Sequence, residues 1–294
     1  MADVGIDAVR ALLSAKPRPV GWAERRERID EVGSVWPVAG DVTLESVHLG
    51  GLPGEWSIAP GSDPSRVLLF FHGGGYCSGS IVSHRRMVTE AGRAAAARTL
   101  AVAYRLAPEH PFPAAYDDAL AAWRFLREQG VAANRIAVGG DSAGGGLTVA
   151  LINRLREAGE IGPACAWLAS PWTDLTMTGE TLATKDAVDP LIHKGYLEEL
   201  ANAYLPSGMD PRDPRVSPLY AEIKGFPPTL IQVGSNETLL SDATRLAAAA
   251  GADDVSVMLE IWPRMIHAWP LWNARLADGR AALARAGAFI REHI

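Results

Sequence analysis

The sequence predicts an α/β fold with a mostly parallel sheet covered by helices, and three features of the chain lead to that prediction. Short apolar runs suited to strands alternate with amphipathic stretches suited to helices along most of its length. The apolar runs are continuous instead of alternating with polar residues, which indicates strands buried on both faces. With 294 residues the chain can bury one full core, so we expect residues 1–294 to form a single domain.

The elements follow one another along the chain, and each is expected from its own local pattern. Two amphipathic or charged helices, separated by prolines, are expected within about the first 35 residues. Strands are expected where apolar or alternating residues run together, at 42–47, 55–59, 67–71, 100–104, 136–138, 165–169, 229–233 and 255–261. Helices are expected where apolar residues recur every three or four positions, at 84–98, 114–130, 143–158, 240–250 and 281–294.

One long segment breaks this alternation. Residues 171–228 are rich in proline and contain a single clear helix pattern, at 195–204. A connection of this length inside a compact domain is usually functional. We therefore expect a helical cap over the functional site, contributed by about 1–40 and 171–228. The alternative is a surface excursion that has no role in the site.

Composition and charge argue against several classes of partner. The net charge is −6, so no basic surface favours nucleic acid or an anionic membrane. The N-terminus lacks the apolar core of a signal peptide, and no apolar run approaches the ~18 residues that would span a bilayer. We expect a cytoplasmic protein in which Cys77 and Cys165 are buried free thiols. No cluster of His, Asp or Cys has the spacing of a metal site, and no cofactor is expected.

Two glycine-rich turns carry the chemistry. The first is Gly-Asp-Ser-Ala-Gly at 140–144, which follows an apolar run and precedes a helix-like stretch. A serine on such a sharp strand-to-helix turn is exposed to substrate, and the flanking glycines permit the turn because a Cβ there would collide with neighbouring backbone. Ser142 is therefore the expected nucleophile, and Asp141 is expected to brace the turn.

The second turn is His-Gly-Gly-Gly at 72–75, directly after another apolar run. Bare N–H groups in such a loop can stabilise the oxyanion of an acyl-transfer intermediate. We expect the oxyanion donors to be the backbone N–H groups of Gly74, Gly75 and Ala143. A plain tight turn or a phosphate-binding loop is the alternative, but no Lys-Ser/Thr pair follows the glycines. The two turns together predict a serine hydrolase.

The chain has seven histidines, and one of them lies where a general base is needed. His267 follows the last expected strand, which is where a hydrolase with the chain order serine, acid, histidine has its base. His72 is expected to brace the glycine loop, and His110 lies in a Pro-Glu-His-Pro turn. The other four are expected to be solvated: His48, His84, His193 and His293.

These motifs resemble those of the bacterial hormone-sensitive-lipase-type esterases, a branch of the α/β-hydrolase superfamily. The resemblance extends from residue 72 to residue 267, and the motifs are far more specific together than singly. The matching stretches are HGGG at 72–75, YRLAPEHPFPAA at 104–115, GGDSAGG at 139–145, SPWTDL at 170–175 and Ile-His at 266–267.

The resemblance implies an α/β-hydrolase fold with an eight-stranded core, a cap, and carboxylic-ester hydrolysis without a cofactor. It also implies small-molecule ester substrates with short or medium acyl chains, and homodimers in many members. Hydrolysis of lactones or of O- or N-acetyl groups, amidase activity and acyl transfer use the same residues and stay open as alternatives. A non-catalytic receptor is a remote alternative, since the related plant gibberellin receptors have lost the histidine that His267 supplies here.

The orienting acid departs from the commonest pattern of these relatives. Many of them have Asp early in the loop after the penultimate strand, where this chain has Asn236, and an amide cannot supply the charge that stabilises imidazolium. Glu237 comes next, 30 residues before His267 (267 − 237), which is the separation that the resemblance implies, and it is the predicted acid. The alternatives are Asp242, expected at the start of the following helix, and Asp174, after the preceding strand.

Several aromatic residues near these motifs are candidates to line an apolar substrate pocket. We expect Tyr76, Trp172 and Trp269 to contact substrate, with Met177 and Trp272 as further candidates. Core packing is the alternative for each of them taken singly.

Overall fold

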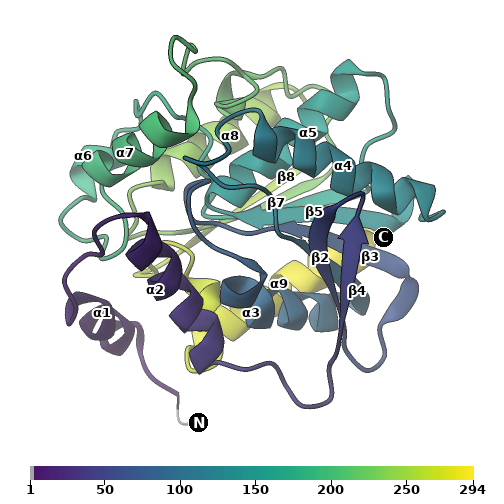
Figure 1. The fold of residues 1–294 in the computed structure, drawn as a ribbon, viewed down its shortest axis with the longest axis horizontal. Helices are drawn as coiled ribbons and strands as arrows, with labels where there is room; N and C mark the ends of the chain where they lie inside the picture. Colours follow the sequence, from purple (N-terminus) through teal and green to yellow (C-terminus); the bar gives the residue numbers. More distant parts are fainter. Residues whose placement is uncertain (1–2) are drawn as a thin grey trace.

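The computed structural model describes residues 3–294 and shows a central eight-stranded sheet with helices on both faces (Figure 1). The strand order is β1-β2-β4-β3-β5-β6-β7-β8; β2 is antiparallel to β1 and β4, and all other neighbours are parallel. The strands are β1 (Thr43–Leu49), β2 (Leu52–Ile58), β3 (Asp63–Phe71), β4 (Ala97–Val102), β5 (Ile136–Asp141), β6 (Cys165–Ala169), β7 (Thr229–Gly234) and β8 (Val257–Trp262). The helices are α1 (Ile6–Ser14), α2 (Trp22–Val35), α3 (Ile81–Ala95), α4 (Ala114–Glu128), α5 (Ala143–Glu157), α6 (Thr181–Thr184), α7 (Lys194–Tyr204), α8 (Leu240–Ala252) and α9 (Ala277–His293). The predicted α/β class with a mostly parallel sheet is confirmed.

Both faces of the sheet are buried, as the continuous apolar runs predict. Along β3, Val67, Leu69 and Phe71 pack in one core cluster with α4 and α5, whereas Leu68 and Phe70 pack in a second cluster with α3 and α9. None of these five side chains is more than 1% exposed. Since successive side chains of a strand point to opposite faces, a strand covered on both sides is apolar at every position.

Some element boundaries differ from the expectation, and helix capping explains the difference at α3. Helix α3 begins at Ile81 instead of residue 84 because Ser80 caps it, with reciprocal hydrogen bonds between Ser80 and Ser83. The helix ends before Ala96, which has a left-handed φ of 51°. Strand β4 therefore starts inside the stretch that was expected to be helical. Shifts of two to four residues also affect the starts of β3, β8 and α9.

The segment 171–228 leaves the sheet and carries α6 and α7, on the same side of the molecule as α1 and α2 (Figure 1). An ion pair of 2.7 Å between Arg25 of α2 and Glu199 of α7 joins the two parts. Arg26 ties α2 to the core, because its guanidinium donates to the carbonyls of Cys77 and Ala107. Among residues 3–294, no helix combines the length and the apolar character needed to cross a membrane.

Candidate active site

Ser142 lies on a tight turn between β5 and α5, where neighbouring backbone leaves no room for side chains on the flanking glycines. A Cβ on Gly140 would lie 2.2 Å from the carbonyl oxygen of Gly144, and one on Gly144 would lie 2.0 Å from that of Phe71. Ser142 itself has φ 52° and ψ −121°, a conformation that L-residues rarely adopt. The predicted sharp strand-to-helix turn is thus present, with the serine at its apex.

Glu237 and His267 meet beside this turn. The Nδ1 atom of His267 lies 3.2 Å from Oε1 of Glu237, whose side chain is fully buried. The second carboxylate oxygen accepts hydrogen bonds from the Ser170 hydroxyl at 2.8 Å and the Gly234 N–H at 2.7 Å. These two donors fix the carboxylate, so that Oε1 is directed at the imidazole.

The electrostatic environment of His267 favours its protonated form. Burial lowers the pKa of the imidazole, but the hydrogen bond and the charge of Glu237, together with the charges of Asp189 and Asp141, outweigh it. The pKa of His267 is therefore raised above its usual value. An imidazole in this setting can accept a proton and hold it as a stabilised imidazolium.

The two alternative acids have other contacts. Asp242 accepts hydrogen bonds from the N–H groups of Thr173 and Asp174, at 2.8 and 2.9 Å, and burial raises its pKa to about 7. Asp174 forms an ion pair of 2.8 Å with Arg245 and accepts hydrogen bonds from nearby threonine hydroxyls. Burial alone would raise the pKa of Asp174, but these partners bring it to about 2. No hydrogen bond or ion pair between either carboxylate and His267 occurs in residues 3–294.

The glycine loop at 72–75 is held against the serine turn by Asp141. Gly74 and Gly75 have φ values of +114° and +64°, which glycine adopts without strain. The Asp141 carboxylate accepts a hydrogen bond of 2.9 Å from the Gly73 N–H, and Tyr104 donates from its hydroxyl to the His72 carbonyl at 2.7 Å. Asp141 thus braces the two turns, as expected, and positions the loop next to Ser142.

The third predicted oxyanion donor, Ala143, is the first residue of α5 and is fully buried. Its N–H belongs to the first turn of a helix, where backbone donors have no partner within the helix and attract negative charge. His72 is also buried, and burial together with the charge of His84 lowers its pKa to about 3. A neutral His72 that contacts the Gly73 carbonyl suits the bracing role assigned to it.

The expectation that His84 is solvated is wrong. Its side chain is 1% exposed, and its Nε2 atom lies 3.2 Å from the Asp141 carboxylate. The reason is its place on α3, where His84, Met87, Val88 and Ala91 share one buried face. This helical spacing is visible in the sequence and would have placed the residue inside.

A cavity of about 320 Å³ contains the site, and its lining includes Ser142, His267, Gly74 and Gly75. Much of the remaining lining comes from the N-terminal helices and from the segment before and within α7. Examples are Leu13, Ile29, Val32, Leu191, Ile192, Leu197 and Leu200. Among the positively charged lining residues, Arg25 is held between the rings of Trp22 and Tyr196, 4.8 and 4.9 Å from their centroids.

Tyr76, Trp172 and Trp269, which were predicted to contact substrate, are not among the residues that line this cavity. Tyr76 is 2% exposed and stacks on Tyr204 with ring centroids 4.0 Å apart, and both tryptophans are fully buried. All three belong to buried core clusters of the fold, as their size and apolar character favour. Trp272, one of the further candidates, does line the cavity.

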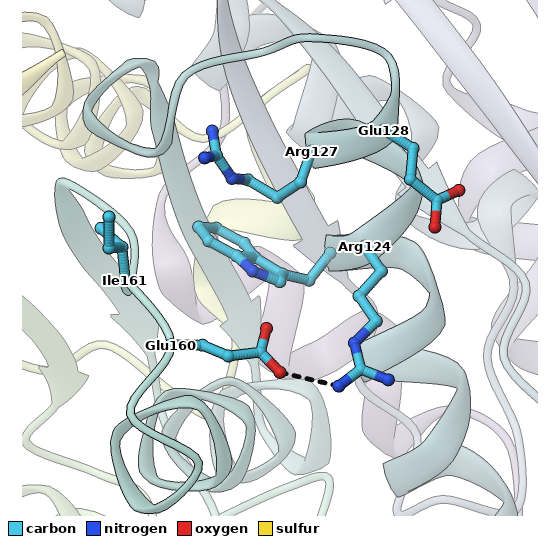
Figure 2. Close-up of a pocket in the computed structure, with 6 residues that line it drawn as sticks. Arg124, Arg127, Glu128, Glu160 and Ile161 are labelled. Atoms are coloured by element: carbon cyan, nitrogen blue, oxygen red, sulfur yellow. Dashed lines mark hydrogen bonds and ion pairs between the residues drawn. The ribbon is translucent and has the colours of Figure 1, made fainter.

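A second cavity, of about 360 Å³, shares no lining residue with the first (Figure 2). It lies between α4 and the loop after α5, where Arg124 pairs with Glu160 at 2.7 Å.

Cys77 and Cys165 are buried free thiols, as predicted, and burial raises the pKa of each to about 12. Within residues 3–294, no group of three or more His, Cys, Asp or Glu side chains is placed to hold a metal ion.

The chain is similar to several known proteins. Residues 68–271 match the protein-family model described as the alpha/beta hydrolase fold. The chain belongs to the α/β-hydrolase family. This hydrolase is 41% identical to an acetyl-hydrolase of Streptomyces hygroscopicus, over 99% of its own length and 97% of that relative. It is 34% identical to an esterase of Acinetobacter venetianus, over 88% and 85% of the two chains.

A solved esterase of the bacterial hormone-sensitive lipase family superposes on this hydrolase with a TM-score of 0.96. The two are 41% identical, and the match covers 100% of both chains. The esterase EstE5, solved after soaking with p-nitrophenyl butyrate, superposes with a TM-score of 0.94 at 41% identity, over 98% of both chains. The resemblance to hormone-sensitive-lipase-type esterases, proposed from the motifs, is confirmed.

Proposed function

We propose that Ser142, His267 and Glu237 form a catalytic triad that hydrolyses carboxylic esters through an acyl-enzyme. The observation that carries this proposal is the contact of 3.2 Å between Glu237 and His267, because His267 lines the same cavity as the strained Ser142. Nucleophile, base and orienting acid are the three groups that such a reaction requires. The chain is a carboxylesterase, in line with its relatives named esterase and acetyl-hydrolase.

In the first half of the reaction, the Ser142 hydroxyl attacks the acyl carbon while His267 takes its proton at Nε2. Glu237 holds the Nδ1–H of His267 and stabilises the imidazolium that forms. The backbone N–H groups of Gly74, Gly75 and Ala143 stabilise the oxyanion, and each such donor typically lowers the barrier by about 3 kcal/mol. His267 then returns its proton to the leaving alcohol, and water cleaves the acyl-enzyme by the same steps.

The substrate is a small ester with a short or medium acyl chain. A volume of about 320 Å³ lies at the small end of ligand sites, and 1–40 and 171–228 contribute much of its apolar wall. These two segments act as the cap and limit the length of chain that fits. Acetyl esters are the favoured short-chain class, because the acetyl-hydrolase relative matches nearly the whole chain. Lactone hydrolysis and amidase activity remain the second candidates.

The experiment that tests the triad compares the parent with Ser142→Ala. The variant should fold normally and lose essentially all esterase activity, and an organophosphate should label the parent alone. A p-nitrophenyl ester chain-length series, with a lactone and an acetylated amine alongside, identifies the substrate class. Residual turnover in Ser142→Ala comparable to the parent would refute the assignment of the nucleophile.

The protein is proposed to form a homodimer. Strand β8 ends the sheet, and it exposes Met258 and Ile261 at 50% and 47%. An edge strand with apolar side chains favours pairing with a second chain. Sedimentation of the parent and of Ile261→Lys distinguishes a dimer through this edge from a monomer.

A further inference from the structure

Asp189 is a buried carboxylate in the segment 171–228 that has no part in the mechanism described so far. Its side chain is 3% exposed. Oδ1 accepts hydrogen bonds from the N–H groups of Leu191 and Ile192, at 2.9 and 3.1 Å. Oδ2 accepts from the N–H and the hydroxyl of Thr238, at 2.9 and 3.3 Å. Both oxygens therefore contact donors only, which is the pattern expected of an ionised carboxylate.

These contacts join two parts of the site that are far apart in the sequence. Leu191 and Ile192 line the cavity that contains Ser142. Thr238 is the residue directly after Glu237, and its backbone is held by Asp189 through the N–H group. One carboxylate thus links the cavity wall to the loop that carries the orienting acid.

Asp189 also contributes charge at the catalytic base. Three carboxylates from three elements raise the pKa of His267: Glu237 from the loop after β7, Asp189 from the segment 171–228, and Asp141 from the serine turn. The pKa of Asp189 itself is raised, because burial and the charge of Glu237 outweigh the charge of His267 and the N–H donors of Thr238 and Leu191, which lower it. The carboxylate and the imidazolium therefore stabilise each other.

We propose that Asp189 is a positioning residue that couples the cavity wall at 191–192 to the orientation of Glu237, and so sets both turnover and acyl-chain selectivity. The proposal rests on the triad proposed above. A substrate that displaces Leu191 or Ile192 also displaces the loop that holds the acid. Acyl chains that fit against Leu191 and Ile192 leave Glu237 in place, whereas longer chains displace it.

The test uses Asp189→Asn, Asp189→Ser and the control Asp186→Asn. Asp186 is an exposed acid in the same segment, so the control removes the same charge without the contacts. Serine can still accept a hydrogen bond from the turn at 191–192, which makes the second variant less disruptive to the fold. The readouts are kcat and KM for p-nitrophenyl esters of increasing chain length, the pH profile of kcat/KM, and Tm.

Both Asp189 variants should lower kcat for p-nitrophenyl butyrate roughly 10- to 100-fold, well short of the ~10⁴-fold typical for loss of a triad acid. They should also flatten the chain-length profile. The acid limb of kcat/KM should move to lower pH, because the base loses a negative neighbour and its pKa falls. Asp186→Asn should match the parent in all three readouts.

Three outcomes overturn the proposal. The first is that Asp189→Asn and Asp189→Ser keep the parent kcat, chain-length profile and acid limb. The second is that Asp186→Asn changes these readouts as much as they do. The third is that both Asp189 variants fail to fold while Asp186→Asn folds, which assigns Asp189 to the fold alone. Failure of the triad itself is a separate result, since it requires Ser142→Ala or Glu237→Gln to stay active.

Discussion

Replacing Glu237 by glutamine tests the triad member for which the sequence offers three candidates, and it changes the shape of the side chain very little. The carboxylate accepts hydrogen bonds from Ser170 and Gly234 at Oε2 and contacts His267 at Oε1. A glutamine whose carbonyl keeps the Ser170 and Gly234 donors presents its NH₂ group to His267. The imidazole then accepts at Nδ1 and carries its proton on Nε2, so it cannot take a proton from Ser142.

The expected loss follows from this change of tautomer. A triad with the wrong tautomer typically loses about 10⁴-fold in kcat, which corresponds to about 5.5 kcal/mol at 1.36 kcal/mol per tenfold change. KM should change little, because Glu237 is fully buried and does not line the cavity. The assay is steady-state hydrolysis of p-nitrophenyl butyrate, with Tm and circular dichroism to confirm folding.

The matched control is Asp242→Asn, an equally conservative change of a buried acid on the same segment. Asp242 contacts the backbone of Thr173 and Asp174 and not the imidazole, so this variant should keep kcat within a few-fold. If Glu237→Gln retains full kcat while Asp242→Asn loses it, the acid is Asp242 and the assignment of this loop is refuted.

Four further predictions concern the base, the second buried acid, the serine turn and the N-terminal helices. In the parent, kcat/KM should fall as the pH drops through the raised pKa of His267, because the protonated imidazole cannot act as base. Asp242 has a pKa of about 7 when folded and about 3.9 when unfolded, so the folded state binds the extra proton. Tm should therefore decline as the pH rises from about 4 to 7, and Asp242→Asn should remove that decline. A variant with the same pH dependence of Tm as the parent contradicts this. Gly144→Ala should lose about 1–3 kcal/mol of stability or most of its activity, because the new Cβ would lie 2.0 Å from the Phe71 carbonyl oxygen. A variant with the parent Tm and kcat would show that the turn can relax. Removing residues 1–35 should alter chain-length selectivity more than folding, because several of them, among them Leu13 and Ile29, line the cavity. An unchanged selectivity profile would make the N-terminal helices peripheral.

Local patterns were sufficient for the sheet and for the two reactive turns. Continuous apolar runs predict strands buried on both faces, and all eight expected strands overlap strands of the structure. Gly140 and Gly144 flank Ser142 because backbone passes within about 2 Å of where a Cβ would stand. Such constraints act over a few neighbouring residues, so they leave a signature in the sequence. Helix ends were less predictable, as the Ser80 cap of α3 shows.

Tertiary structure decided which distant residues meet. Sequence separation favoured Glu237 over Asp242, but only the packing of β7 against β8 brings its carboxylate to His267. Tyr76, Trp172 and Trp269 are residue types common in substrate pockets, but they are buried in the core. Apolar side chains suit both places, so residue type alone did not distinguish them. The link that Asp189 makes left no local signal, because its partner Thr238 lies 49 residues away on another segment. Contacts between segments depend on how the whole chain packs, and for that reason the cavity lining and the charges around the base became readable only in three dimensions.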